Sequence, residues 1–212
     1  KKSSEMDAIL KLNLAVNIKD CHKALIFFKT PAQNFICTDR DHISITHNGY
    51  TPKKSLGDGF FIMPSNKLDI WESSIGDEEL PFLMDPKKGF LGSANQVAVS
   101  EKYKYYLGWY YDDSFRAERI SQELSKTNKL FSVNDMFDLQ NDVHDLLAEK
   151  ATPLLLKNIN RNLLSKEQLS AILLLENWDY QALHNSISPS LFYAWWKSLK
   201  KNIWSDQLWD VD

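Results

Sequence analysis

The pattern of apolar and polar positions divides the chain into a mixed first half and a helical second half. Apolar residues over 5–29 predict one or two helices, with Asp20 capping the second and Pro31 ending the region. Positions 34–46 change to period two, which predicts a β-hairpin that turns at residues 39–42. The next strand pair is expected over 88–99.

The second half carries helical signals almost throughout. Apolar spacing predicts helices over 115–127, 132–149, 152–160, 166–177 and 189–203. Ser132 with Asp135 and Ser165 with Gln168 have the spacing of capping boxes at two of the helix starts. One apolar stripe is expected along a single helix, formed by Met136, Leu139, Val143, Leu146 and Leu147.

Between the hairpin and the next strand pair, residues 50–81 contain most of the glycine and proline, and they predict a surface excursion with short strands. The fold class is therefore α+β. Residues 1–115 are expected to form a mixed, strand-containing part and residues 116–212 a helical part.

The composition is that of a globular protein, and the charge reduces the range of partners that we expect for it. The 212 residues are 43% apolar, which fits a folded protein with a sizeable core. The net charge is −3, and neither half has the basic excess of a phosphate-backbone binder, so we expect no nucleic-acid partner. No apolar run of about 18 residues is present, so no membrane span is predicted.

The chain has two cysteines, Cys21 and Cys37, which either form a disulfide or are two buried thiols. They do not form a C-x-x-C motif, and the five histidines are scattered, so we expect no metal site from their spacing. A polar acidic run at 77–79 is most simply a solvated surface.

Five segments carry a resemblance to a known family. The most informative, over 85–123, begins DPKKGFLGSANQ and continues through YYLGWYYDDSFR. Others are PAQNFICTDRDHISITHNGYTP (31–52), GDG (57–59), DIWESSIGDEELP (69–81) and SVNDMFDLQNDVHDLLAEKATPLL (132–155). In this order and spacing they resemble the penicillin acylase family of N-terminal-nucleophile hydrolases, although that family usually has glycine in the hairpin turn at 39–42.

The resemblance implies a fold, an activity and site residues. The fold would be part of the four-layer αββα core of these hydrolases, carrying a large helical region. The activity would be cleavage of a linear N-acyl amide through an acyl-enzyme. Asn95 matches the family's oxyanion-hole donor and Arg116 matches an arginine that orients it. Trp109 and Gln33 fall where the family contacts the acyl group of the substrate.

Each of these residues also has a plainer interpretation. Asn95 would be a turn residue that bonds its own backbone. Arg116 would be a helix-start arginine paired with Asp112, Asp113 or Glu118, because a cation near a helix N-terminus needs a carboxylate partner. Trp109 would be a core aromatic residue, and Gln33 simply the residue that starts the hairpin.

The family's nucleophile is the first residue of a chain released by autoproteolysis, and its α-amino group acts as the base. This chain starts KKSSE, which does not match. We therefore expect an interior fragment of the large (β) subunit, inactive alone, whose partners are the substrate, the α subunit and the rest of the β subunit. The resemblance implies no cofactor, allows a structural calcium, and suggests a periplasmic or extracellular location.

One calcium-binding carboxylate of the family has no counterpart, because Tyr105 or Tyr106 stands there. Two other functions are open to the same residues: a binding module derived from the family that has no nucleophile, and a helical interaction domain formed by the Trp-rich C-terminal part.

Overall fold

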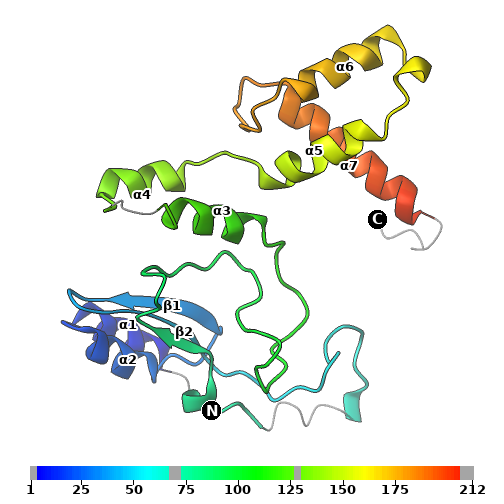
Figure 1. The fold of residues 1–212 in the computed structure, drawn as a ribbon. Coiled ribbons are helices and arrows are strands. Elements are labelled where there is room, and N and C mark those ends of the chain that lie inside the picture. The colour runs from blue at the N-terminus through cyan, green and yellow to red at the C-terminus, as the bar shows by residue number, and fades with distance from the viewer. Residues whose placement is uncertain (1–3, 67–72, 127–129, 206–212) are drawn as a thin grey trace. The chain divides into compact units, whose positions relative to one another are not determined.

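The computed structural model describes residues 4–66, 73–126 and 130–205. The chain separates into two compact units, Lys1–Ala117 and Glu118–Asp212. The first contains a small antiparallel sheet with helices and long loops, and the second is helical (Figure 1). The predicted α+β class is therefore confirmed.

The first unit is organised by a three-stranded sheet in the order β1-β2-β3. Strand β1 (Gln33–Thr38) pairs antiparallel with β2 (Ile43–Asn48), and β2 pairs antiparallel with β3 (Phe82–Met84). Helices α1 (Glu5–Asn13) and α2 (Ile18–Leu25) precede the sheet, and a 3-10 helix, η2 (Asp77–Glu79), precedes β3. The predicted hairpin is confirmed, and the region expected to form one or two helices forms two.

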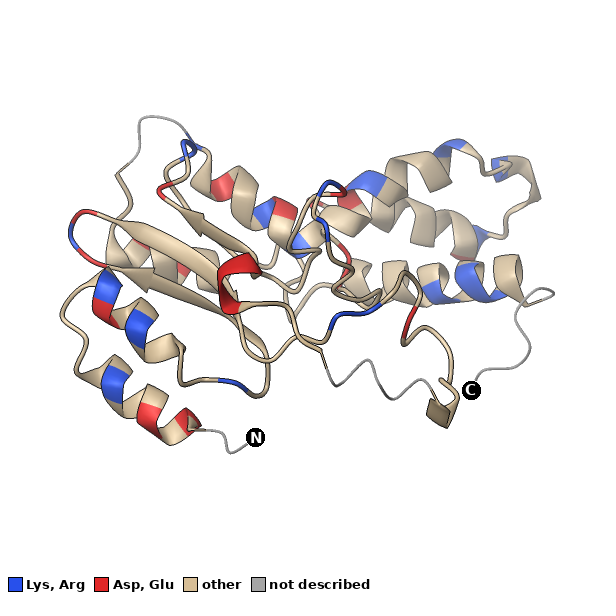
Figure 2. Ribbon diagram, turned by 90° about the horizontal axis from the view of Figure 1, so that it is seen from below, with Lys and Arg blue, Asp and Glu red and all other residues tan. Residues whose placement is uncertain are grey.

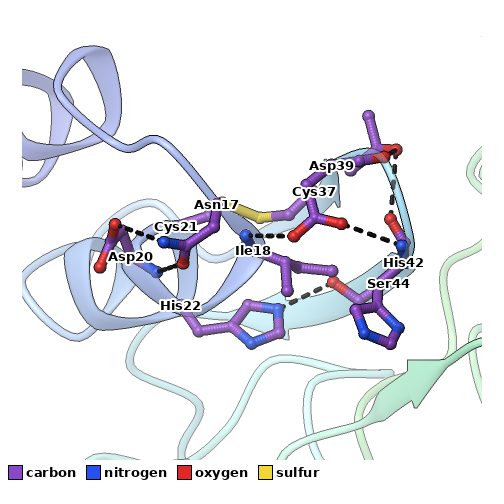
Figure 3. The surroundings of a disulfide bond; sticks show 10 residues. Asn17, Ile18, Asp20, Cys21, His22, Cys37, Asp39, His42 and Ser44 are labelled. Carbon is purple, nitrogen blue, oxygen red and sulfur yellow. Dashed lines mark hydrogen bonds between the residues drawn. A yellow bond between two sulfur atoms is a disulfide. The ribbon is translucent and has the colours of Figure 1, made fainter.

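Helix α2 packs on one face of this sheet. Ile18 and Leu25 of the helix form a buried cluster with Cys37 of β1, against which Phe35 and Met84 pack. Cys21 and Cys37 are joined by a disulfide bond, which ties α2 to β1 (Figure 3). The structure thereby decides between the two interpretations of the cysteines, and the free-thiol alternative is wrong.

The hairpin turn needs no glycine because Asp39 organises it. Its Oδ1 accepts hydrogen bonds from the backbone N–H of Asp41 and His42, at 3.0 and 2.9 Å. Its Oδ2 accepts from the N–H of Ile18 at 3.0 Å, in the first turn of α2 (Figure 3). These backbone hydrogen bonds, the one from Ile18 first, hold the pKa of the Asp39 carboxyl below its usual value.

The N-cap of α2 differs from the sequence-based expectation. Asn17 is the N-cap, and its side chain accepts a hydrogen bond from the N–H of Asp20 at 2.9 Å. Asp20 lies inside the first turn, where its charge suits the positive end of the helix. Its prediction as the cap was wrong because Asn17 offers the same capping chemistry three positions earlier.

The long segment 85–114 carries no helix or strand, so the strand pair expected over 88–99 was wrong. Its start is a turn in which the N–H of Gly89 donates to the carbonyl of Pro86 at 2.8 Å. The excursion over 50–81 pairs only through isolated bridges in its described part, such as Pro52 with Ser74. Part of the DIWESSIGDEELP motif, residues 69–72, lies outside the described residues.

The second unit is built from helices. Helix α3 (Phe115–Leu124) begins at the end of the first unit. Its successors are α4 (Val133–Gln140), α5 (Leu146–Lys157), α6 (Lys166–Glu176) and α7 (Ser188–Trp204), with a 3-10 helix, η3 (Arg161–Leu163), before α6. The helices predicted to start at 115, 166 and 189 are confirmed, each starting within one or two residues of the predicted position. The predicted end of the first of them, residue 127, lies outside the described residues.

A core of aromatic and small residues holds α5, α6 and α7 together. Its buried members are Ala148, Ala151, Leu175, Trp178 and Phe192, and Trp195 and Trp196 pack against them. The Phe192 ring lies nearly parallel to that of Trp196, with centroids 6.0 Å apart. No helix in the described part of the chain is long and apolar enough to cross a membrane.

The helix expected over 132–149 is two helices. The chain leaves the helix after Gln140, and α5 begins at the N-cap Asp145, whose side chain accepts from the N–H of Ala148 at 2.9 Å. In the break, the Asp142 carboxylate accepts two hydrogen bonds from Arg119 of α3, at 3.0 and 2.6 Å. The expected single stripe is therefore divided, and the helix predicted from 152 is the second half of α5.

Candidate functional site

Asn95 stands at a backbone position that suits asparagine. Its φ is +65°, in the left-handed region that asparagine tolerates better than most residues. The preceding residue, Ala94, is buried, and its N–H donates to Oε1 of Gln96 at 2.6 Å. The carbonyl of Asn95 accepts from the N–H of Asp112 at 2.9 Å. The surrounding chain thus fixes this conformation from both sides.

Arg116, in the first turn of α3, holds the side chain of Asn95. Its Nη2 donates to Oδ1 of Asn95 at 2.7 Å and to the carbonyl of Ala94 at 3.0 Å. The same nitrogen donates to Oδ2 of Asp112 at 2.6 Å. The carboxylate partner expected for a cation at a helix start is therefore Asp112.

The hydrogen bond with Arg116 shows which terminal atom of the Asn95 amide is the oxygen and which is the nitrogen. A guanidinium only donates hydrogen bonds, so the atom facing it must be the amide oxygen. The amide nitrogen then points away from Arg116. No acceptor for this nitrogen is present among the residues that the structure describes, and the Asn95 side chain is exposed. The amide N–H of Asn95 is therefore exposed and has no acceptor among the described residues.

A cavity of about 910 Å³ lies in the first unit beside this segment. Ser93 and Gln96 line it, so it borders the Asn95 turn, although Asn95 itself is not in its wall. Asn34 of β1 also lines it and donates to Oγ of Ser93 at 2.9 Å. His47 of β2 lies 3.0 Å from Oδ1 of Asn34, and burial lowers the pKa of this histidine.

Gln33 begins β1 and is exposed. It pairs with Asn48 across the hairpin, and its neighbour Asn34 makes the hydrogen bond to Ser93. The start of β1 is therefore next to the 93–96 segment in space, although no direct contact of Gln33 with Asn95 is recorded for the described residues.

Trp109 takes part in an aromatic cluster. Its ring lies 4.5 Å from that of Phe60 and 5.5 Å from that of Tyr110, centroid to centroid, and its Nε1 donates to the carbonyl of Gly59 at 2.8 Å. Among the described residues these contacts link Trp109 to the GDG turn at 57–59 and not to Asn95. The structure thus joins Asn95 and Arg116 directly, whereas Trp109 is held by a different part of the unit.

The neighbourhood of Tyr105 does not fit a calcium ion. Its hydroxyl donates to Oε2 of Glu79 at 2.7 Å, and the ammonium of Lys104 bonds the other carboxylate oxygen. Glu79 ends the acidic 3-10 helix η2 (Figure 2). The hydrogen bonds from Lys104 and Tyr105 lower its pKa to about 2. The one carboxylate that bonds Tyr105 is therefore already paired with a lysine ammonium. In the described part of the chain, no cluster of three potential metal ligands is found.

The sequence predicted roles for Asn95 and Arg116 but did not reveal a group of hydrogen-bonded residues close to the Asn95 turn. Asn34, His47 and Ser93 are linked across two strands and a loop, so no spacing in the sequence could reveal it. Asp112 was one of three possible partners of Arg116. The structure selects it because it lies four residues before Arg116 and reaches Nη2 directly.

The family model for penicillin amidase matches residues 1–211 of the chain. The chain therefore belongs to the penicillin amidase family. It is 30% identical over 155 residues to the acyl-homoserine lactone acylase QuiP of Pseudomonas putida, which is 71% of this chain and 18% of that protein. It is 29% identical over 150 residues to the QuiP protein of Pseudomonas aeruginosa, covering 68% of this chain and 17% of that protein.

The fold has a counterpart among solved structures. The thermostable penicillin G acylase from Alcaligenes faecalis superposes with a TM-score of 0.63 at 15% identity, over 86% of this chain and 34% of that one. This likeness bears out the predicted relation to the N-terminal-nucleophile hydrolase fold. The chain spans less than a fifth of the length of the curated relatives that it matches.

Proposed function

We propose that this chain supplies the oxyanion-hole donor of an acylase that hydrolyses a linear N-acyl amide. The observation that carries the proposal is the hydrogen bond from Arg116 to the amide oxygen of Asn95, at 2.7 Å. It leaves the amide N–H of Asn95 as an oriented donor with no acceptor among the described residues. Membership in the penicillin amidase family supports amide hydrolysis as the reaction.

The proposed chemistry proceeds through an acyl-enzyme. A nucleophile attacks the carbonyl carbon of the amide, and negative charge develops on the carbonyl oxygen in the transition state. The N–H of Asn95 donates a hydrogen bond to that oxygen. Arg116 polarises the Asn95 amide through its oxygen, which makes the N–H a stronger donor. The amine then leaves, and water releases the carboxylic acid.

The nucleophile is proposed to lie outside these 212 residues. Only about a fifth of each curated relative is matched, which leaves room for the segments that would carry it. In this proposal the nucleophile is the N-terminal residue of a chain freed by self-cleavage, and its amino group is the base, since an amino-terminal pKa near 8 suits proton uptake at neutral pH. The chain alone is then inactive.

The substrate class is an N-acyl compound. The relatives' names point to acyl-homoserine lactones and to penicillin G as candidate substrates. Gln33 and Trp109 are proposed to contact the acyl group. The Cys21–Cys37 disulfide supports a periplasmic or extracellular location, because disulfides persist in oxidising compartments.

The test uses the full-length protein that contains this chain, with an acyl-homoserine lactone and penicillin G as substrates. Asn95→Asp keeps the size of the side chain and tolerates the left-handed backbone, but an ionised carboxylate cannot donate. We expect kcat to fall by about 10²- to 10³-fold, the usual cost of losing one oxyanion-hole donor.

The matched control is Asn134→Asp, the same change at an exposed asparagine on α4, which should leave kcat unchanged. Mass spectrometry of the purified protein shows separately whether the precursor cleaves itself. Full turnover in Asn95→Asp would show that the oxyanion assignment is wrong.

A further inference from the structure

Asp112 connects both parts of the Asn95–Arg116 pair. It lies in the loop before α3, where its backbone N–H donates to the carbonyl of Asn95 at 2.9 Å. Its carboxylate accepts from Nη2 of Arg116 at 2.6 Å. Arg116 in turn donates to Oδ1 of Asn95. The three residues therefore form a closed ring of hydrogen bonds, in which each one is bound to the other two.

The ring uses one nitrogen of the guanidinium for all three acceptors. Nη2 carries two hydrogens but faces the Asn95 amide oxygen, the Ala94 carbonyl and the Asp112 carboxylate. The carboxylate is the strongest acceptor of the three because it is charged. Its position therefore decides where the Nη2 hydrogens point, and with them how the Asn95 amide is turned.

Both side chains of the Arg116–Asp112 ion pair are largely exposed, so the pair affects the orientation of the guanidinium more than the stability of the fold. The side chains of Arg116 and Asp112 are 59% and 49% exposed. Ion pairs in such surroundings contribute little to folding because water screens them. Without the carboxylate, however, the exposed guanidinium would be free to adopt other rotamers in water, and the Asn95 amide would lose its fixed orientation.

We propose that Asp112 is a positioning residue for the oxyanion donor: it holds the Arg116 guanidinium so that the amide N–H of Asn95 points to the substrate carbonyl. This role rests on the proposed function. Asp112 touches no reacting atom in it and acts only through Arg116 and Asn95.

The experiment is a double-mutant cycle in the full-length protein, with hydrolysis of the better of the two acyl substrates as readout. Asp112→Ala should lower kcat by about 10-fold or more, since small misplacements of a catalytic group are costly, with KM within about twofold of the parent. In an Asn95→Gly background, which removes the amide and suits the left-handed backbone, the same Asp112→Ala change should alter kcat by less than about twofold, because the group it positions is gone.

Two further variants separate positioning from a general effect on the loop. Asp112→Asn keeps an acceptor oxygen at the same distance but loses the charge, so it should restore kcat in part, to a value between those of Asp112→Ala and the parent. Asp113→Ala removes the neighbouring exposed carboxylate, for which no contact is recorded among the described residues, and should leave kcat unchanged. If Asp112→Ala does not accumulate, Asp112→Ser, which is too short to reach the guanidinium, replaces it.

Three results would overturn the role of Asp112. These are an unchanged kcat in Asp112→Ala, an equal loss in both backgrounds, and no rescue by Asp112→Asn. The proposed function fails in a different way, namely by full turnover in Asn95→Asp or Asn95→Gly itself, and that result would remove the basis of this role as well. A loss in Asn95→Gly with an additive loss from Asp112→Ala would overturn the positioning role alone.

Discussion

The core of the helical unit and the segment around Asn95 in the first unit are stabilised by different kinds of interaction. In the helical unit, Phe192 is fully buried and stands with Trp178 and Leu175 in one apolar cluster. In the first unit, the segment around Asn95 is held by directional polar contacts, such as those of Arg116 and Asp112. Helix packing tolerates small shifts, whereas a ring of hydrogen bonds sets the direction of a single N–H.

This difference agrees with the role proposed for the Asn95 segment of the first unit. An oxyanion-hole donor must point to within a few tenths of an ångström of its target, and polar contacts with fixed geometry achieve that. A loop without strand or helix can place Asn95 in the left-handed conformation, because no neighbouring ladder imposes extended geometry. The helical unit contains none of the proposed reacting groups.

The largest effect is expected in the apolar core of the helical unit. Phe192→Ala should destabilise this unit by about 3 to 5 kcal/mol, since a fully buried ring leaves a cavity. Hydrogen exchange of the α5–α7 amides in the full-length protein measures the loss. Leu163→Ala is the control, because Leu163 is 80% exposed. Its effect should stay within about 0.5 kcal/mol. Equal protection in Phe192→Ala and the parent would contradict the apolar-core picture.

An intermediate effect is expected at the disulfide of the first unit. Replacing both cysteines, Cys21→Ser with Cys37→Ser, should cost about 3 kcal/mol, the value for a closed loop of this size. The sequence separation is 16 residues. Amide exchange in α2 and β1 should accelerate, while that of α5–α7 stays the same. Reductant should reproduce the effect in the parent and have none in the double variant. Unchanged exchange in α2 after reduction would show that the bond does not support this packing.

The smallest effect is expected at the hairpin turn. Nδ1 of His42 lies 2.7 Å from Oδ2 of Asp85, and this hydrogen bond raises the pKa of the histidine. A raised folded-state pKa means that the stabilisation is fully present below the unfolded pKa of about 6.5 and is lost as pH rises through the folded value. NMR titration of the ring protons should show the raised pKa.

Asp85→Asn should bring the pKa of His42 back toward its ordinary value, whereas Asp41→Asn should change it much less, since Asp41 acts only through space and is the weakest contributor. Equal shifts in the two variants would mean that general acidity of the turn, and not the bond to Asp85, sets this pKa.

The sequence predicted the parts of the fold that depend on local rules. The capping boxes at Ser132 and Ser165 form as expected, each with reciprocal hydrogen bonds to the third helical residue. The hairpin follows its period-two pattern, with Thr38 opposite Ile43 at the turn. These features depend on residues close in the chain, so a pattern can reveal them.

The failed predictions of one helix over 132–149 and of a strand pair over 88–99 share one physical cause, which is that distant partners decide the local structure. The expected helix through 132–149 is interrupted where Asp142 binds Arg119, a residue more than twenty positions earlier. The strand pair over 88–99 does not form, because this segment is held instead by contacts such as that of Ser93 with Asn34. For Asn95, the residue type was readable from the sequence, but the direction of its amide depends on Arg116.

The cross-link between Cys21 and Cys37 has a consequence for proteolysis. The connection from α2 to β1 includes Ile26 and Phe27, whose side chains are 56% and 41% exposed, so a protease has access to part of it. Cleavage of the backbone there would leave both fragments joined through sulfur, and they would migrate as one band until a reductant is added. The N-terminal helices would thus remain attached to the sheet even after the chain has been nicked.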